Sequence, residues 1–274
     1  MNQANGVGRK GVTLIELMIA LVISAALVAT LYGTFLTQHH AYTVQDDVLD
    51  MQQNVRVALN EMMREIRMAG FGNIGPILPL TISGKTYNYV INPDVPSKGA
   101  LTILAAIGGA TTLTGLNPPP DHDQIRVSGT ALFDTIKRKY ISIAGIESYG
   151  IMNISANTLT LDRKVVTSFK TGGNTPVYAI RAITYLVPSG TTVLRRNENL
   201  GGGAQPLAED IENVTFQYFD ENGNPTLAPL DFRTIRVTVT ARTKRADLKF
   251  KAGAGDGYRR RHVASNILLR NMGL

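Results

Sequence analysis

The sequence predicts an α+β protein in which one long N-terminal α-helix packs on a mainly antiparallel β-sheet head. Three observations predict this order. Residues 12–36 form an almost uninterrupted apolar stretch, residues 37–69 continue it with an amphipathic pattern, and β-branched segments dominate the chain from residue 123 onward. With 274 residues, of which 44% are hydrophobic, the chain is long enough to bury a substantial core.

The composition narrows the possible function classes. The chain has no cysteine, which excludes a disulfide framework, a thiolate zinc site and a cysteine nucleophile. The net charge is +7, and its excess lies in residues 70–274, so acidic proteins, anionic lipid and nucleic acid are all conceivable partners. We find no G-x-S-x-G, Walker or H-E-x-x-H motif, and we therefore expect no enzymatic active site.

The apolar stretch that follows Arg9 and Lys10 is long enough to cross a bilayer, which takes about 20 residues. The two cations before it predict a cytoplasmic N-terminus, a single membrane pass and a C-terminal head outside the bacterial inner membrane. A secretory signal peptide fits less well, because its apolar region is shorter and is followed by a small-residue cleavage site.

One carboxylate, Glu16, lies inside this apolar stretch, where a charge is costly without a partner. Cleavage between Gly11 and Val12 would create an α-amine one helical turn away from Glu16. That amine, from the same chain or from a neighbouring subunit in a helix bundle, can neutralise the carboxylate. This pairing predicts that Glu16 sets the axial register between subunits.

The segment GVTLIELMIALVI resembles the prepilin-type N-terminal signal of type IV pilins, in which a short basic leader ends in glycine before an apolar helix with an early glutamate. The resemblance implies that prepilin peptidase cuts after Gly11, that Val12 becomes N-methylated, and that Glu16 serves subunit assembly. It also implies that major and minor pilins are partners and that the chain moves from the inner membrane into a pilus. Val12 stands where Phe or Met is commoner, and Gly33 stands where many major pilins have a proline, so local melting of the helix is conceivable there.

Residues 37–69 are expected to continue the same helix into the head. Gly70, Gly72 and Pro76 should end it. The apolar residues recur at steps of three and four: Val44, Val48, Met51, Val55, Ala58, Met62 and Ile66. This stripe predicts ordinary core packing against the sheet of the chain itself.

The rest of the chain is expected to form strands and loops. Segments with β-branched enrichment are 123–129, 139–145, 158–164, 177–187, 191–197, 211–220, 231–245 and 261–271. Pro-Ser-Gly joins the fourth and fifth of these as a hairpin. The alternation around Ile235, Val237 and Val239 predicts an antiparallel sheet with one covered face. Residues 70–122 are expected to be irregular, with a few short strands.

The order of these head segments resembles the PilW-like minor pilins and their relatives, the J-type minor pseudopilins of type II secretion. The resemblance implies a minor pilin that primes pilus assembly. Two alternatives stay open: a J-type pseudopilin and, from another class, a membrane-anchored Ca²⁺- or DNA-binding module. The predicted divisions are a leader (1–11), a transmembrane and polymerisation helix (12–36), an amphipathic helix (37–69) and a β-rich pilin head (70–274).

The best metal candidate is a loop in which Asp220, Asn222 and Asn224 match positions 1, 3 and 5 of a calcium loop, with Asp231 at position 12. Pro225 replaces the glycine expected at position 6. The same composition is typical of an ordinary hairpin turn. We therefore expect a turn and no cofactor, with calcium as the lesser alternative.

A basic cluster lies near the C-terminus. Its members are Arg242, Lys244, Arg245, Lys249, Lys251, Arg259, Arg260 and Arg261. It indicates a solvated strand edge that resists aggregation, a docking surface for an acidic neighbouring pilin, or a DNA-binding surface if the pilus takes up DNA. Few aromatic residues interleave it, which argues against single-stranded nucleic acid as a partner.

Overall fold

The computed structural model describes residues 11–70, 80–82, 84–93, 99–116, 123–170, 172, 174–247, 249–250 and 255–272. The described residues up to Leu49 form one compact unit, and those from Asp50 onward form a second. The predicted divisions at residues 11 and 36 concern processing and membrane insertion, and they stay predictions.

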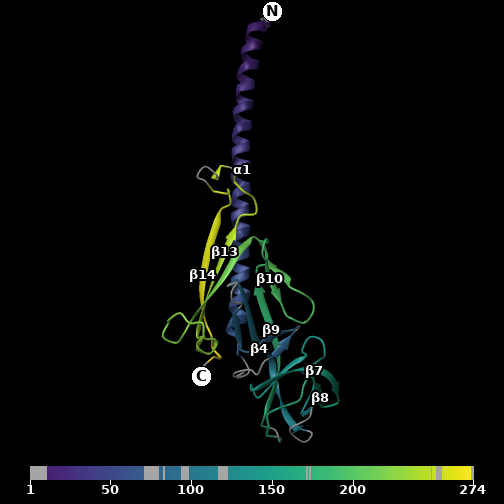
Figure 1. Ribbon diagram of the computed structural model, residues 1–274. Coiled ribbons are helices and arrows are strands. Elements are labelled where there is room, and N and C mark those ends of the chain that lie inside the picture. The colour runs from purple at the N-terminus through teal and green to yellow at the C-terminus, as the bar shows by residue number, and fades with distance from the viewer. Residues whose placement is uncertain are drawn as a thin grey trace, which may run out of the picture. The chain divides into compact units, whose positions relative to one another are not determined.

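The chain contains one long helix followed by strands, which confirms the α+β class (Figure 1). The elements are α1 (Leu14–Arg67), β1 (Leu80–Ile82), β2 (Lys85–Tyr87), β3 (Ile91–Pro93), β4 (Ala100–Leu116), β5 (Gln124–Val127), β6 (Tyr140–Ile143), β7 (Glu147–Ser155), β8 (Thr158–Leu161), β9 (Pro176–Leu186), β10 (Leu194–Asn197), β11 (Gln205–Ala208), β12 (Ile211–Phe219), the 3₁₀-helix η1 (Pro229–Asp231), β13 (Thr234–Arg242) and β14 (Arg260–Leu268).

In the first unit, α1 presents its apolar side chains to the surroundings, and it contains a stretch apolar enough to cross a membrane. The hydroxyls of Thr30, Thr34 and Thr37 donate to the carbonyls four residues earlier, at 2.8, 3.0 and 2.9 Å. Such bonds satisfy polar groups that lipid cannot solvate. The helix is continuous through Gly33, so the local melting that this glycine suggests is not seen.

The C-terminal end of α1 is fixed from two sides. Gly70 has a positive φ of 74° and donates its N–H to the carbonyl of Leu104 at 3.1 Å. The side-chain amide of Asn271 donates to the carbonyl of Ala69 at 3.2 Å, which satisfies one of the acceptors left open at a helix end. The predicted end at Ala69 is therefore confirmed to within two residues.

In the second unit, α1 packs on a three-stranded antiparallel sheet in the order β12-β13-β14. The predicted alternation on β13 is confirmed, because Ile235, Val237 and Val239 are fully buried. The helix supplies the facing apolar stripe, and burial of each large side chain contributes about 1.5–3 kcal/mol. The buried members of that stripe are Met51, Val55, Ala58, Met62 and Ile66.

The remaining long strands form a nine-stranded antiparallel sheet, part of which closes on itself. β4, β9, β6, β7, β8 and β5 pair in that order, and β5 pairs again with β4. This ring encloses its own apolar core, which includes Leu113, Ile125, Ile141, Leu159 and Val177. A small closed barrel thus lies beside the helix-covered sheet, and the sequence patterns did not predict it.

The expectation of an irregular segment before residue 123 was wrong for β4, which is a 17-residue strand. Its sequence is rich in alanine and glycine, which are depleted in strands, so propensity argues against it. Pairing with β9 along most of its length overrides that propensity. A register shift between Ala106 and Ala110 accommodates Gly108, whose φ is 71°.

Candidate functional site

The N-terminal turn of α1 holds Glu16 in a capping box. The backbone N–H and the hydroxyl of Thr13 both donate to Oε2 of Glu16, at 2.9 and 3.0 Å. In return, the N–H of Glu16 donates to the Thr13 hydroxyl at 3.3 Å. This reciprocal arrangement satisfies donors that the first helical turn leaves open. The carboxylate therefore has a partner within the intact chain.

The proposed cleavage point lies just before this turn. Gly11 and Val12 precede the first residue of α1, and the Val12 side chain is 75% exposed. A side chain added at Gly11 would meet nothing within 4 Å. Oε1 of Glu16 has no partner among the described residues, so it is available to an additional cation. Arg9 and Lys10 lie outside the described residues.

A buried acid near the other end of α1, Glu65, joins the helix to the larger sheet. It is 2% exposed, and it accepts a hydrogen bond from the hydroxyl of Tyr185 at 2.8 Å. Arg196 donates to both of its oxygens, from Nη2 at 2.9 Å and from Nε at 3.3 Å, and Arg181 lies 3.5 Å away. Two guanidinium groups and one hydroxyl of β9 and β10 thus surround one carboxylate of α1.

Burial raises the pKa of the Tyr185 hydroxyl, and the adjacent negative charge of Glu65 raises it further. Tyr185 therefore stays protonated at every physiological pH and acts as a permanent donor to Glu65. We interpret this cluster as a fixed link between helix and sheet rather than as an acid–base pair.

In the candidate calcium loop, main-chain groups of the turn itself bind the Asp220 carboxylate. Oδ1 of Asp220 accepts the backbone N–H groups of Asn222 and Asn224, at 2.9 and 2.8 Å. These bonds, the Asn224 N–H first, lower the pKa of Asp220. Asp231 lies apart on η1. Within the described part of the chain, no group of three or more His, Cys, Asp or Glu residues is placed to hold a metal ion.

Part of the basic cluster is neutralised inside the head. Arg260 pairs with Glu212 at 2.7 Å and with Asp256 at 2.5 Å. Arg259 pairs with Asp247 at 3.0 Å, and the Arg242 guanidinium lies 4.2 Å from the centre of the Tyr258 ring. Lys251 lies outside the described residues. The cluster is therefore a set of links between β12, β13 and β14 as well as a positive surface.

The links made by Arg260 predict a pH dependence. Its guanidinium holds the pKa values of Glu212 and Asp256 below their usual range. A depressed pKa contributes stability that is present above the unfolded value of about 4 and is lost as pH falls through the folded value. We expect Arg260→Gln to lower the melting temperature of the detergent-solubilised chain slightly at pH 7. The difference from the wild type should be constant above about pH 5, begin to shrink below about pH 4 and disappear only below the folded pKa values of the two carboxyls; a difference that does not shrink as the pH falls below about 4 would contradict this assignment.

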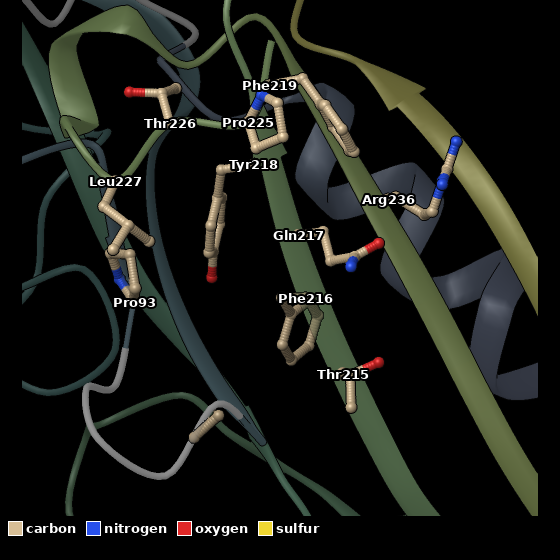
Figure 2. Close-up of a pocket in the computed structure, with 11 residues that line it drawn as sticks. Pro93, Thr215, Phe216, Gln217, Tyr218, Phe219, Pro225, Thr226, Leu227 and Arg236 are labelled. Atoms are coloured by element: carbon tan, nitrogen blue, oxygen red, sulfur yellow. The ribbon is translucent and has the colours of Figure 1, made fainter. Parts of the chain in front are cut away.

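An apolar groove of about 880 Å³ lies beside β12 (Figure 2). Figure 2 shows Phe216 and Tyr218 on the side of β12 that faces Pro93 and Leu227. The Tyr218 ring stacks on Phe232 with centroids 4.4 Å apart. Among the described residues that line the groove there is no Asp, Glu, His or Lys, and Arg236 contributes a guanidinium to it.

The capping box and the buried Glu65 were not predicted, although the sequence contains a signal for each. The capping box is readable from the Thr-x-x-Glu spacing of Thr13 and Glu16. Glu65 adjoins Ile66 on the apolar stripe, and an acid at such a position needs a buried partner. The partner residues themselves lie more than a hundred positions away, and no local pattern identifies them.

Comparison with known protein families gives a match in the N-terminal segment. Residues 8–32 match the model of the prokaryotic N-terminal methylation motif, which includes Gly11, Val12 and Glu16. The match supports a type IV pilin-like protein, either a pilin or a pseudopilin. It implies processing by prepilin peptidase and association with other pilins, and the apolar helix suggests a membrane anchor. None of the curated proteins and none of the solved structures matches the chain significantly.

Proposed function

We propose that this chain is a minor pilin of a type IV pilus, a structural subunit rather than an enzyme. Prepilin peptidase cleaves it between Gly11 and Val12, and Val12 is then N-methylated. The mature chain is anchored in the inner membrane with its head in the periplasm. It enters the filament when its N-terminal helix bundles with those of other subunits. There it primes assembly together with other minor pilins.

The observation that carries this proposal is the coincidence of three features at the start of α1. Gly11 is exposed and lies before the helix, Glu16 is the acid in the first turn, and the apolar side chains that follow are exposed. Such a surface requires lipid or other helices around it. An acid at this place finds a cationic partner when cleavage creates an amine at Val12.

The minor-pilin assignment is further supported by the three-stranded sheet. In this sheet, β12 is the IENVTFQYF segment, and the Asp/Asn/Gly turn follows it. The predicted long strand is β13, and the C-terminal strand is β14. Asn271, in the final Leu-Arg-Asn, binds the end of α1. The segments whose order resembles PilW-like proteins thus form one structural unit around the helix.

A J-type minor pseudopilin of type II secretion is the second candidate, because the N-terminal motif is common to pilins and pseudopilins. Deletion of the gene separates the two: loss of pili supports the first, and loss of a secreted enzyme with normal pili supports the second. A membrane-anchored Ca²⁺- or DNA-binding module remains the candidate of another class. Stabilisation by Ca²⁺ or salt-dependent retention of DNA would favour that module.

The cleavage itself is tested by mass spectrometry of the chain from sheared filaments. We expect the N-terminus at Val12 with one added methyl group. Replacement of Gly11 by a bulkier residue should leave the leader attached, because the peptidase must accommodate this position. Mature protein that still begins at Met1, or a fully processed Gly11 variant, would overturn the assignment.

A further inference from the structure

Strand β14 forms one edge of the three-stranded sheet. In Figure 1 it is the yellow arrow beside β13. Among the described residues it pairs with β13 alone, along all nine positions from Arg260 to Leu268 and without any register shift. Its opposite edge therefore carries main-chain groups that no described strand uses.

The direction of those groups follows from two hydrogen bonds at the ends of β14. Arg259 accepts from the N–H of Thr243 at 2.9 Å, and Leu269 donates to the carbonyl of Arg233 at 2.8 Å. Odd-numbered residues thus direct their main-chain groups to β13, and even-numbered residues direct theirs away from it. The central residues that face the open edge are His262, Ala264 and Asn266, all exposed.

The outer edges of the nine-stranded sheet and the β12 edge of this sheet are short, contain proline or are partly paired, which hinders pairing with another strand. β3 has three residues and ends at Pro93, and β11 has four residues and contains Pro206. The outer edge of β12 is occupied at both ends, where Ile211 donates to Thr192 and Tyr218 accepts from Thr226. β14 contains no proline and no bulge. Its residues from His262 to Leu268 include no Asp, Glu, Lys or Arg.

The charge at the start of β14 indicates what the edge binds. Arg260 is neutralised by Glu212 and Asp256, whereas Arg261 is exposed and has no ion pair among the described residues. A second copy of β14 could not supply the missing carboxylate, because Arg260–Leu268 contains no acid. An occupant complementary in charge is therefore a different segment that carries Asp or Glu at one end.

We propose that the open edge of β14 binds an extended segment of a different polypeptide, which adds as a fourth strand and places a carboxylate beside Arg261. Main-chain hydrogen bonds to His262, Ala264 and Asn266 provide the affinity, and the acid provides the register. The further statement that this polypeptide is another filament subunit rests on the proposed function.

Amide hydrogen exchange on the full-length chain tests the proposal. The three outward amides are compared between detergent-purified protein and the chain in sheared filaments and membranes. They should exchange quickly in the purified protein and at least about tenfold more slowly in the assembled material, as amides in a strand ladder do. Equal exchange in both overturns the proposal. Protection that develops in the purified protein with rising concentration also overturns it, in favour of a second copy.

Two variants sharpen the test. Ala264→Pro removes an outward N–H that β13 does not use, so the head should fold and the protection of His262 and Asn266 should disappear. Ala264→Val keeps the N–H and serves as the matched control. Arg261→Glu, which leaves the backbone unchanged, should also abolish protection. Protection that survives both Ala264→Pro and Arg261→Glu contradicts strand addition.

The outcome is separable from that of the proposed function. A chain absent from filaments overturns the pilin assignment. Protection of the same amides in membranes, lost in Arg261→Glu, would then still establish strand addition by another polypeptide. A chain present in filaments with unprotected amides leaves the pilin assignment intact and removes the edge proposal.

Discussion

Replacing Glu16 by Gln is expected to leave cleavage after Gly11 intact and to lower incorporation into filaments at least about tenfold, because the Val12 amine would then enter the apolar helix bundle without a carboxylate to neutralise it. The amide oxygen of Gln can still accept from the N–H of Thr13, which now donates to Oε2 of Glu16. The substitution therefore removes the charge and keeps the start of the helix.

The measurement is the ratio of mature chain in sheared filaments to mature chain in membranes. Thr13→Ala is the matched control, because it removes the hydroxyl of the capping box and keeps the Glu16 charge, at a cost of about 1 kcal/mol. Glu16→Ala removes the charge and also the acceptor of the capping box. It should therefore lower incorporation at least as much as Glu16→Gln does. Wild-type incorporation of Glu16→Gln would show that the charge of Glu16 has no role in assembly.

Replacing Glu65 by Ala is expected to lower the free energy of unfolding of the head by about 3–5 kcal/mol. The substitution leaves the Arg196 guanidinium and the Tyr185 hydroxyl without the acceptor that both now share. Tyr185 is fully buried, so water cannot easily replace the lost acceptor. Urea unfolding of the full-length chain in detergent, followed by circular dichroism, measures the loss.

The matched control is Glu61→Ala, one turn earlier on the same helix. Glu61 forms an ion pair with Arg64 at 2.7 Å, and the Arg64 side chain is 70% exposed. Exposed helical pairs of this kind contribute about 0.3–0.5 kcal/mol. A loss at Glu65 no larger than that at Glu61 would mean that the buried cluster does not stabilise the link between helix and sheet.

The fold was largely predictable wherever the signal is local. The stripe through Met51, Val55 and Ala58 repeats with the period of a helix, and Gly70 ends the pattern, so α1 is predicted to within two residues at its end. The alternation at Ile235 and Val237 likewise identifies β13 and its buried face. Each of these patterns is complete within a few turns or a few residues of chain.

The residues of the candidate site likewise separate into those with a local sequence signal and those without one. Gly11, Val12 and Glu16 are recognisable because their spacing along the chain matches the N-terminal methylation motif. Glu65 was not identified, since its partners on β9 and β10 approach it only after the sheet has formed. At Asp220 the composition predicted a turn, with calcium as the lesser alternative, and the structure shows a turn in which backbone amides donate to the carboxylate.

Local patterns in the sequence are enough to identify the long apolar helix, the acid within it, the match to the N-terminal methylation motif and the α+β order, because periodicity and spacing are properties of neighbouring residues. The folded head alone shows that β4 through β9 close into a ring, that Arg196 and Tyr185 meet Glu65, and that no described strand covers the outer edge of β14. Those features depend on pairing between distant segments, whose register is set by the packing of the whole head and not by any local pattern.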